Sequence, residues 1–177
     1  GLAVLSGRPH ATRHGRSGVY FSADQMVWRS AADAERSLRL FGLVMAKVSG
    51  RVNEDRFLQF GLVQTGTFPG RRTDSVAFVI NDQTFSRLAL HNIRTARASR
   101  GNTDDLPRHQ IMMELAYGVQ INANLRISPN IHYIINPDQL ADPFRTQRVG
   151  NVLAIGLRFA VEVPLIQASR GSEAARD

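Results

Sequence analysis

Charged and amide side chains recur at alternate positions in three segments of this chain. They are Gln110, Glu114, Gln120, Arg126, Asn130, His132 and Arg158. Because alternate residues of an extended chain point to the same side, these side chains would form one polar surface on neighbouring strands. Such a surface offers hydrogen-bond donors, acceptors and charges, which suits noncovalent contact with a polar solute.

Covalent and metal chemistry are not expected on this surface. The chain contains no cysteine, which excludes disulfides, thiolate catalysis and cysteine-ligated zinc or iron–sulfur sites. Its five histidines show no metal-binding spacing such as HExxH. Ser128 and His132 would share a strand face, but two steps apart they are too distant for a nucleophile and its base. We therefore predict no enzyme, no metal site and no cofactor.

The positions between the polar residues are apolar, and the alternating runs are long. They cover residues 111–121, 125–135 and 153–163. A half-buried strand of a soluble sheet needs alternation over about 4–8 residues, whereas a strand that crosses a bilayer needs about 9–11. A chain in lipid must satisfy its backbone polar groups internally, so alternating strands cross a membrane only as a closed barrel. The pattern predicts an all-β, antiparallel transmembrane β-barrel.

Composition leaves a soluble domain open as the alternative. The 177 residues are 43% hydrophobic with a mean hydropathy of −0.20, and polar lumen residues would give a barrel the same ordinary average. A soluble antiparallel β domain that binds a small ligand or a protein partner fits equally well. The net charge of +7 is compatible with nucleic-acid binding. We do not expect that partner, because many arginines fall in predicted loops and no RNA-stacking motif or recognition helix is visible.

Seven strands are predicted, and their connections orient the sheet. The strands cover residues 18–29, 37–48, 56–66, 74–84, 109–122, 125–136 and 151–163, with an eighth candidate at 1–6. The connections at 122–124 and 68–71 are tight, as expected on the periplasmic side of a barrel, and those at 85–108 and 137–150 are long, as expected outside the cell. A short helix is predicted near 85–93. Residues 1–163 would form one barrel segment, followed by a polar tail at 164–177.

Five short motifs follow one another in a characteristic order. They are Gly-Val-Tyr-Phe-Ser-Ala-Asp-Gln-Met-Val-Trp-Arg at 18–29, Leu-Phe-Gly at 40–42, Gly-Leu-Val at 61–63 with Pro-Gly-Arg at 69–71, Glu-Leu-Ala-Tyr at 114–117, and Ile-His-Tyr-Ile-Ile-Asn-Pro at 131–137. Together they resemble the C-terminal half of the carbohydrate-selective porin family, the OprB-type outer-membrane porins.

The resemblance implies a sixteen-stranded barrel in the outer membrane of a Gram-negative bacterium, through which sugars diffuse passively. Seven or eight strands are about half of such a barrel, and the chain begins at Gly1 without an initiator Met or a signal peptide. We therefore expect a porin segment, with a non-functional porin fragment as an alternative. The implied partners are mono- or oligosaccharides, outer-membrane lipid, lipopolysaccharide and further copies of the chain in a homo-oligomer.

On this resemblance the polar face becomes the lumen wall. We expect Arg126, Arg158 and Glu114 to form part of a polar sugar track. The same face would carry Gln120, Asn130, His132 and Gln110, with Asp24 added from the first strand, and Asn81, Gln59, Lys47 and Arg39 from the earlier strands. A water-facing strand surface would carry such residues without any sugar contact, so each individual assignment is a hypothesis.

Four aromatic residues have two interpretations. Trp28 and Tyr20 could stack on a sugar ring, but we expect them, together with Tyr117 and Tyr133, to anchor strands in the aromatic girdle at a membrane interface.

Overall fold

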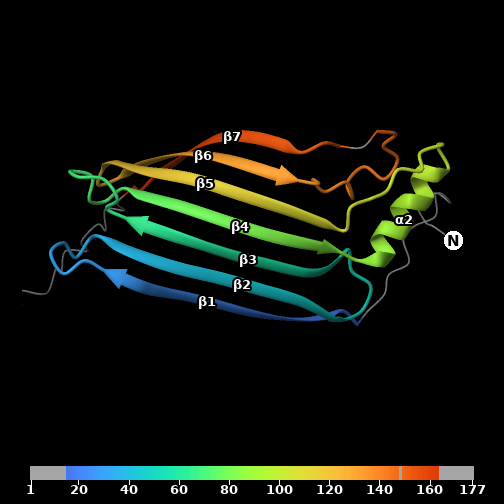
Figure 1. Ribbon diagram of the computed structural model, residues 1–177, viewed down its shortest axis with the longest axis horizontal. Helices are drawn as coiled ribbons and strands as arrows, with labels where there is room; N and C mark the ends of the chain where they lie inside the picture. The colour runs from blue at the N-terminus through green and yellow to red at the C-terminus, as the bar shows by residue number, and fades with distance from the viewer. Residues whose placement is uncertain (1–14, 148, 164–177) are drawn as a thin grey trace, which may run out of the picture.

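The computed structural model describes residues 15–147 and 149–163, which form one antiparallel sheet in chain order (Figure 1). Its strands are β1 (Ser17–Arg29), β2 (Ser37–Ser49), β3 (Glu54–Thr65), β4 (Ser75–Phe85), β5 (His109–Asn122), β6 (Leu125–Ile135) and β7 (Val152–Val161). The prediction of an all-β antiparallel fold is confirmed. Each strand ends within two residues of its predicted bounds. The eighth strand candidate and the polar tail lie outside the described residues.

The short turns lie at one end of the sheet and the long connections at the other, as the sequence predicts. Only Ala123 and Asn124 connect β5 to β6, and the Asn122 side chain accepts a hydrogen bond from the Asn124 amide at 2.9 Å. At the same end, a turn between β3 and β4 is closed by a hydrogen bond from the Arg71 amide to the Phe68 carbonyl at 3.1 Å. The long connections 86–108 and 136–151 lie together at the opposite end (Figure 1).

Strand register sorts the side chains into two faces. One row of paired residues crosses all seven strands: Asp24, Phe41, Gly61, Val79, Glu114, His132 and Ala154. The adjacent row is Ala23, Gly42, Phe60, Ile80, Met113, Tyr133 and Leu153. Because neighbouring strand residues point to opposite sides, we call the face of the first row the inner face and that of the second row the outer face.

The outer face is apolar and uncovered. On β7, Leu153, Ile155, Leu157 and Phe159 keep 57–78% of their surface exposed, and no second layer of the described chain packs over them. Polar residues on this face lie toward both ends of the strands. Asp82 contacts His109 at 3.0 Å and Arg56 at 3.7 Å at the end with the long connections, and Gln25 and Gln64 lie toward the end with the short turns. An apolar band of this extent, bounded by polar groups, is typical of a surface that meets lipid.

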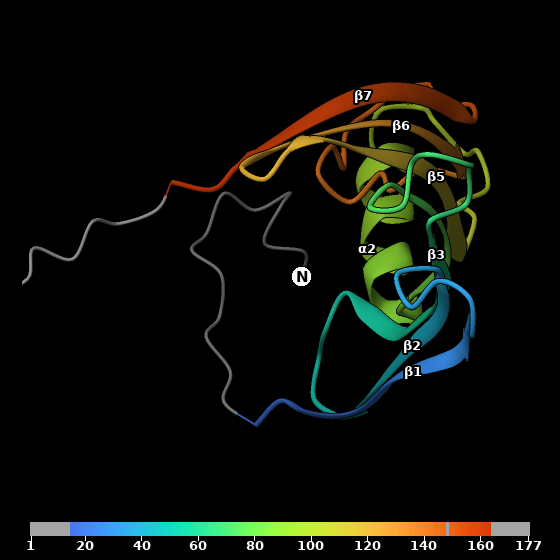
Figure 2. The same cartoon turned by 90° about the vertical axis from the view of Figure 1, so that its left-hand side faces the viewer.

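The sheet is curved and open among the described residues, since β1 and β7 each pair on one side only. Figure 2 shows its curvature from the end with the short turns, with the helix α2 (Arg87–Ala98) on the inner side of the curve. The predicted helix is therefore confirmed and runs a few residues further than expected. It begins at Ser86, whose hydroxyl accepts the Ala89 amide at 3.1 Å as an N-cap. Among the described residues no helix is long and apolar enough to cross a bilayer.

Candidate functional site: the polar inner face

All the predicted lumen residues lie on the inner face. The inner rows of the strand register contain all eight: Gln110, Glu114 and Gln120 on β5, Arg126, Asn130 and His132 on β6, Arg158 on β7, and Asp24 on β1. Asn81, Gln59, Lys47 and Arg39 occupy inner rows of β2, β3 and β4. Their contact with a solute stays a prediction.

Arg126 lies flat against this face rather than projecting from it. Its guanidinium crosses over Gly118 on β5, where a Cβ would approach Nε within 2.6 Å. It reaches the Ser75 hydroxyl on β4, and Nη1 donates to the Gln120 side-chain oxygen at 3.3 Å. A glycine is needed beneath it, because any side chain at position 118 would displace the guanidinium.

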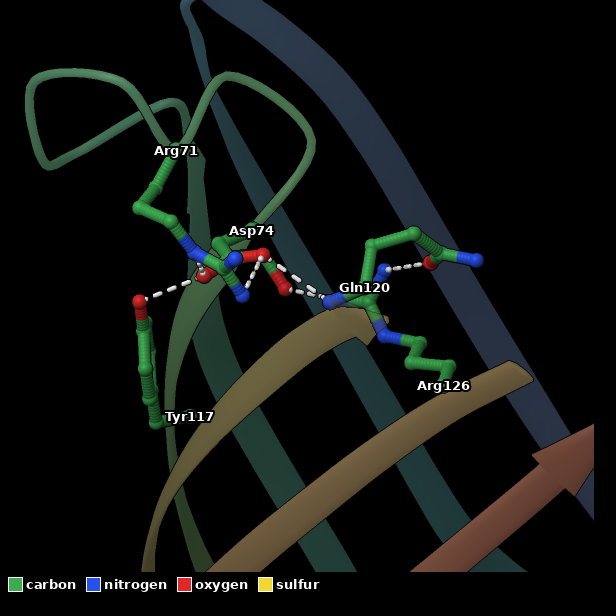
Figure 3. Close-up of polar contacts among 6 residues, drawn as sticks. Arg71, Asp74, Tyr117, Gln120 and Arg126 are labelled. Carbon is green, nitrogen blue, oxygen red and sulfur yellow. Dashed lines mark hydrogen bonds and ion pairs between the residues drawn. The ribbon is translucent and has the colours of Figure 1, made fainter. Parts of the chain in front are cut away.

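A buried carboxylate supports this part of the wall from the turn between β3 and β4. Asp74 is 1% exposed and accepts hydrogen bonds from the Tyr117 hydroxyl at 2.6 Å and the Gln120 amide at 2.9 Å. Arg71 donates to the same carboxylate through Nε at 2.7 Å and Nη2 at 3.1 Å. Figure 3 shows these contacts continuing through the Gln120 side chain to Arg126. Asp74 thus fixes the backbone of Gln120 through its amide, and the Gln120 side chain in turn positions the Arg126 guanidinium.

Burial alone would raise the pKa of the Asp74 carboxyl. The hydrogen bonds from Tyr117, the Gln120 amide and Arg71 outweigh this effect and lower the pKa below its ordinary value. Asp74 is therefore an anion in the folded protein at neutral pH.

The middle of the inner face pairs an acid with a base. Glu114 Oε2 lies 3.7 Å from His132 Nδ1, and the two residues are direct partners across β5 and β6. Asn130 is 8% exposed, and its side chain covers Gly156 of β7. Arg158 is exposed and is the register partner of Ser128. In the part of the chain that the structure describes, no ion pair joins Glu114 to Arg126 or Arg158.

Asp24 belongs to a separate part of the wall. It accepts hydrogen bonds from Arg39 at 2.9 and 3.1 Å, and both side chains are 53% exposed. The structure therefore does not gather the eight predicted residues into one pocket. It distributes them along a curved surface that also carries apolar residues, such as Phe41 and Val79 of the same inner row.

This arrangement of donors, acceptors and charges is suited to noncovalent contact with polar solutes. Its fixed donors and acceptors can replace part of the hydration shell of a passing hydroxylated molecule. Asp24 and Arg39 pair opposite charges across neighbouring strands, whereas Arg126 is held by the neutral side chains of Gln120 and Ser75.

Comparison with known families decides the identity of the fold. Residues 1–162 match the family described as "Carbohydrate-selective porin, OprB family". The chain belongs to this family. The resemblance seen in its motifs is confirmed.

Two relatives of the family cover most of the chain. Porin B from Pseudomonas aeruginosa PAO1 is 27% identical over 166 residues, which are 88% of this chain and 34% of that protein. A structure of Pseudomonas putida OprB determined at high pH superposes with a TM-score of 0.73 at 24% identity, covering 90% of this chain and 38% of that one. The chain therefore spans about a third of the length of the curated relative it matches.

The aromatic residues divide between the two faces of this porin sheet. A bulge between Met26 and Trp28 shifts the phase of β1, so Trp28 pairs with Leu38 on the outer face. Tyr117 and Tyr133 also lie on the outer face. Tyr20 pairs with Met45 on the inner face, so its assignment to an outward girdle is wrong. A girdle role for the other three stays a prediction.

Several further residues shape the inner face, although the sequence does not predict this role for them. They are Ser75, Asp74, Phe41 and the glycines at 61, 118 and 156. The glycines carry a detectable signal, because Gly118 and Gly156 replace side chains at polar-phase positions of otherwise regular strands. Phe41 covers Gly61 in the same manner.

Proposed function

We propose that this chain forms part of the wall of an outer-membrane pore through which sugars diffuse passively. The curved sheet would be one arc of a closed barrel, whose remaining strands pair with the edges β1 and β7. The inner face would line an aqueous lumen, and the outer face would contact lipid and, toward the end with the long connections, lipopolysaccharide. A homo-oligomer would use the same outer face.

The observation that carries this proposal is the continuous apolar outer face of all seven strands, opposite an inner face that carries polar residues on every strand. A soluble sheet that left Ile155 78% and Phe159 61% exposed on an uncovered face would aggregate. In a bilayer the same apolar face contacts lipid chains, while the polar face is hydrated by water in the lumen. Membership of the porin family supports the same assignment.

Sugars are the solute class that the inner face suits best. They are neutral and carry many hydroxyl groups, so they need both donors and acceptors rather than a single sign of charge. The inner face supplies guanidinium donors at Arg126 and Arg158, an acceptor at Glu114, and amides at Gln110 and Gln120. Nothing in this geometry supports turnover of the solute, so we propose a channel and not an enzyme.

Vesicle swelling tests the proposed function. The natural protein, purified from outer membranes and reconstituted in liposomes, should let isosmotic glucose cause swelling, and protein-free liposomes should not swell. Swelling by sugars should exceed swelling by an uncharged solute of similar size with few hydroxyls. A protein that stays in solution after cell lysis and folds without detergent would refute the pore and favour the soluble ligand-binding domain.

A further inference from the structure

One row of the inner face is apolar where it crosses β1, β2 and β3. In the strand register Tyr20 pairs with Met45, and Met45 pairs with Phe57. Tyr20 is 75% exposed and Met45 is 46% exposed, so the described residues leave both side chains largely uncovered. We call Tyr20, Met45 and Phe57 the apolar platform. Its presence on the face that otherwise carries charges and amides requires an explanation, because a pore wall that only met water would not need it.

Polar groups border the apolar platform on two sides. The same row continues on β4 and β5 with Gln83 and Gln110, and Gln110 Nε2 donates to Gln83 Oε1 at 3.1 Å. Toward the strand ends that carry the long connections, Asp55 contacts Lys47 Nζ at 2.5 Å and Arg108 Nη2 at 3.1 Å. The platform is therefore flanked by amides along its row and by opposite charges beside it.

A hollow of about 660 Å³ lies against the platform and the adjacent ion pair. Its lining includes Tyr20, Met45, Phe57, Lys47 and Asp55. Sites that bind small molecules have volumes of about 300–1,000 Å³ and combine apolar and aromatic side chains with a few polar groups. The hollow has both properties.

A saccharide matches the chemistry of this hollow. A pyranose ring carries C–H groups on its faces and hydroxyl groups around its rim. The C–H face can pack on the Tyr20 ring, which removes apolar area from water. The hydroxyls need both donors and acceptors, and the bordering amides and charges supply them. A purely apolar occupant would instead desolvate the Lys47–Asp55 pair without replacing its hydrogen bonds to water.

The platform has room for two sugar rings. Adjacent strands lie about 4.8 Å apart, so the distance from β1 to β3 is about 10 Å. Two linked pyranose rings cover that span, one against Tyr20 and the other against Phe57. We propose that the apolar platform is a saccharide subsite in the pore wall, which stacks on the rings of a disaccharide and binds it more tightly than a monosaccharide. The proposal rests on the proposed pore function for the route by which the sugar arrives, whereas binding itself is measurable without permeation.

Saturation-transfer NMR on the natural protein in detergent micelles tests the subsite, because it detects weak binding and identifies the sugar protons nearest the protein. Maltose should bind more tightly than glucose, with the most saturation on one face of each ring. Tyr20→Ala should weaken maltose binding about tenfold, and Tyr20→Phe, which keeps the ring, should bind as wild type does. Phe21→Ala is the matched control, since Phe21 is the next residue on β1 and is 70% exposed on the outer face.

A second pair of variants keeps the test decisive if Tyr20→Ala does not fold. Phe57→Ala removes the ring at the other end of the platform and should bring the affinity for maltose close to that for glucose. Its control is Phe60→Ala, which removes a 51% exposed ring from the outer face of the same strand.

Unchanged maltose binding in Tyr20→Ala or Phe57→Ala would overturn the proposal, as would equal losses in Tyr20→Ala and Phe21→Ala, or in Tyr20→Phe and Tyr20→Ala. Tyr20→Cys should react with a charged thiol reagent in membranes. Failure to react would mean that another segment of the protein covers the platform, which would also overturn it. Absence of glucose swelling in wild-type liposomes would instead refute the pore, while the NMR titrations would still report whether the platform binds saccharides.

Discussion

Replacing the buried carboxylate of Asp74 should weaken the folded sheet more than any comparable change on its exposed surface. Asp74→Asn keeps the size of the side chain but converts one acceptor oxygen into an NH2 donor. In the structure each carboxylate oxygen faces two donors: Oδ1 receives the Gln120 amide and Arg71 Nη2, and Oδ2 receives the Tyr117 hydroxyl and Arg71 Nε. Whichever oxygen is replaced, two hydrogen bonds to a charged acceptor are lost.

The magnitude follows from these contacts. A hydrogen bond to a charged group contributes about 1.5–3 kcal/mol, but the Tyr117 hydroxyl can rotate to accept, and Arg71, with 44% of its side chain exposed, can turn toward water. We therefore expect a loss of about 2–4 kcal/mol in the free energy of unfolding, near the lower part of the range for breaking a buried ion pair. Asp24→Asn is the matched control, since its ion pair with Arg39 is half exposed and should contribute less than about 1 kcal/mol.

The assay is urea unfolding of the protein folded in detergent micelles, read from the different gel mobilities of folded and unfolded forms. Its pH dependence has a defined sign. Because the folded pKa of Asp74 lies below its ordinary value of 3.8, the stabilisation is complete above that value and is lost as the pH falls toward the folded pKa. The difference in the free energy of unfolding between wild type and Asp74→Asn should therefore be constant near neutral pH and shrink below about pH 4. Equal losses for Asp74→Asn and Asp24→Asn would refute the reasoning.

Three further substitutions test the two faces. Gly118→Val should push the Arg126 guanidinium off the wall and cost about 1–3 kcal/mol in urea unfolding, while Gly150→Val, where no atom lies within 4 Å of a new Cβ, should cost little. Glu114→Gln should raise the chloride-to-potassium permeability ratio about fivefold in a salt gradient, since a unit charge about 8 Å from an ion in water contributes roughly 0.5 kcal/mol, with opposite sign for the two ions; an unchanged ratio would place Glu114 away from the ion path. Ile155→Arg should reduce the stability of the membrane-inserted protein by about 2–4 kcal/mol, and Ala154→Arg on the inner face should not; equal losses would mean that the faces are misassigned.

The strands could be predicted almost completely because their signal is local and repeated. The long alternation of apolar and polar residues in β5, β6 and β7 determines which face each residue occupies, since a shift of one residue would turn every apolar side chain to the wrong face. The short turn at Ala123–Asn124 then fixes the pairing of β5 with β6. Helix α2 was also accessible, because Phe85, Leu88 and Ala89 recur at helical spacing.

The remaining features depend on contacts between distant residues or on a single break in the period. The bulge beside Trp28 reverses the face of that residue relative to Asp24, and no local propensity marks it. The contact of Asp74 with Tyr117 spans 43 residues and that of Arg97 with Gln139 spans 42. An arginine in a predicted loop is ordinarily solvated, so the burial of Arg97 appears only when both connections are folded together.

Thiol accessibility along two adjacent rows tests most directly that the inner face lines water and the outer face contacts lipid. The chain has no cysteine of its own, so single cysteines can be placed at Glu114, His132 and Ala154 of the inner row and at Met113, Tyr133 and Leu153 of the outer row. In membranes, a charged water-soluble thiol reagent should modify the three inner-row cysteines and leave the three outer-row cysteines unmodified. Modification of both rows at equal rates would contradict the assignment of the two faces and, with it, the pore.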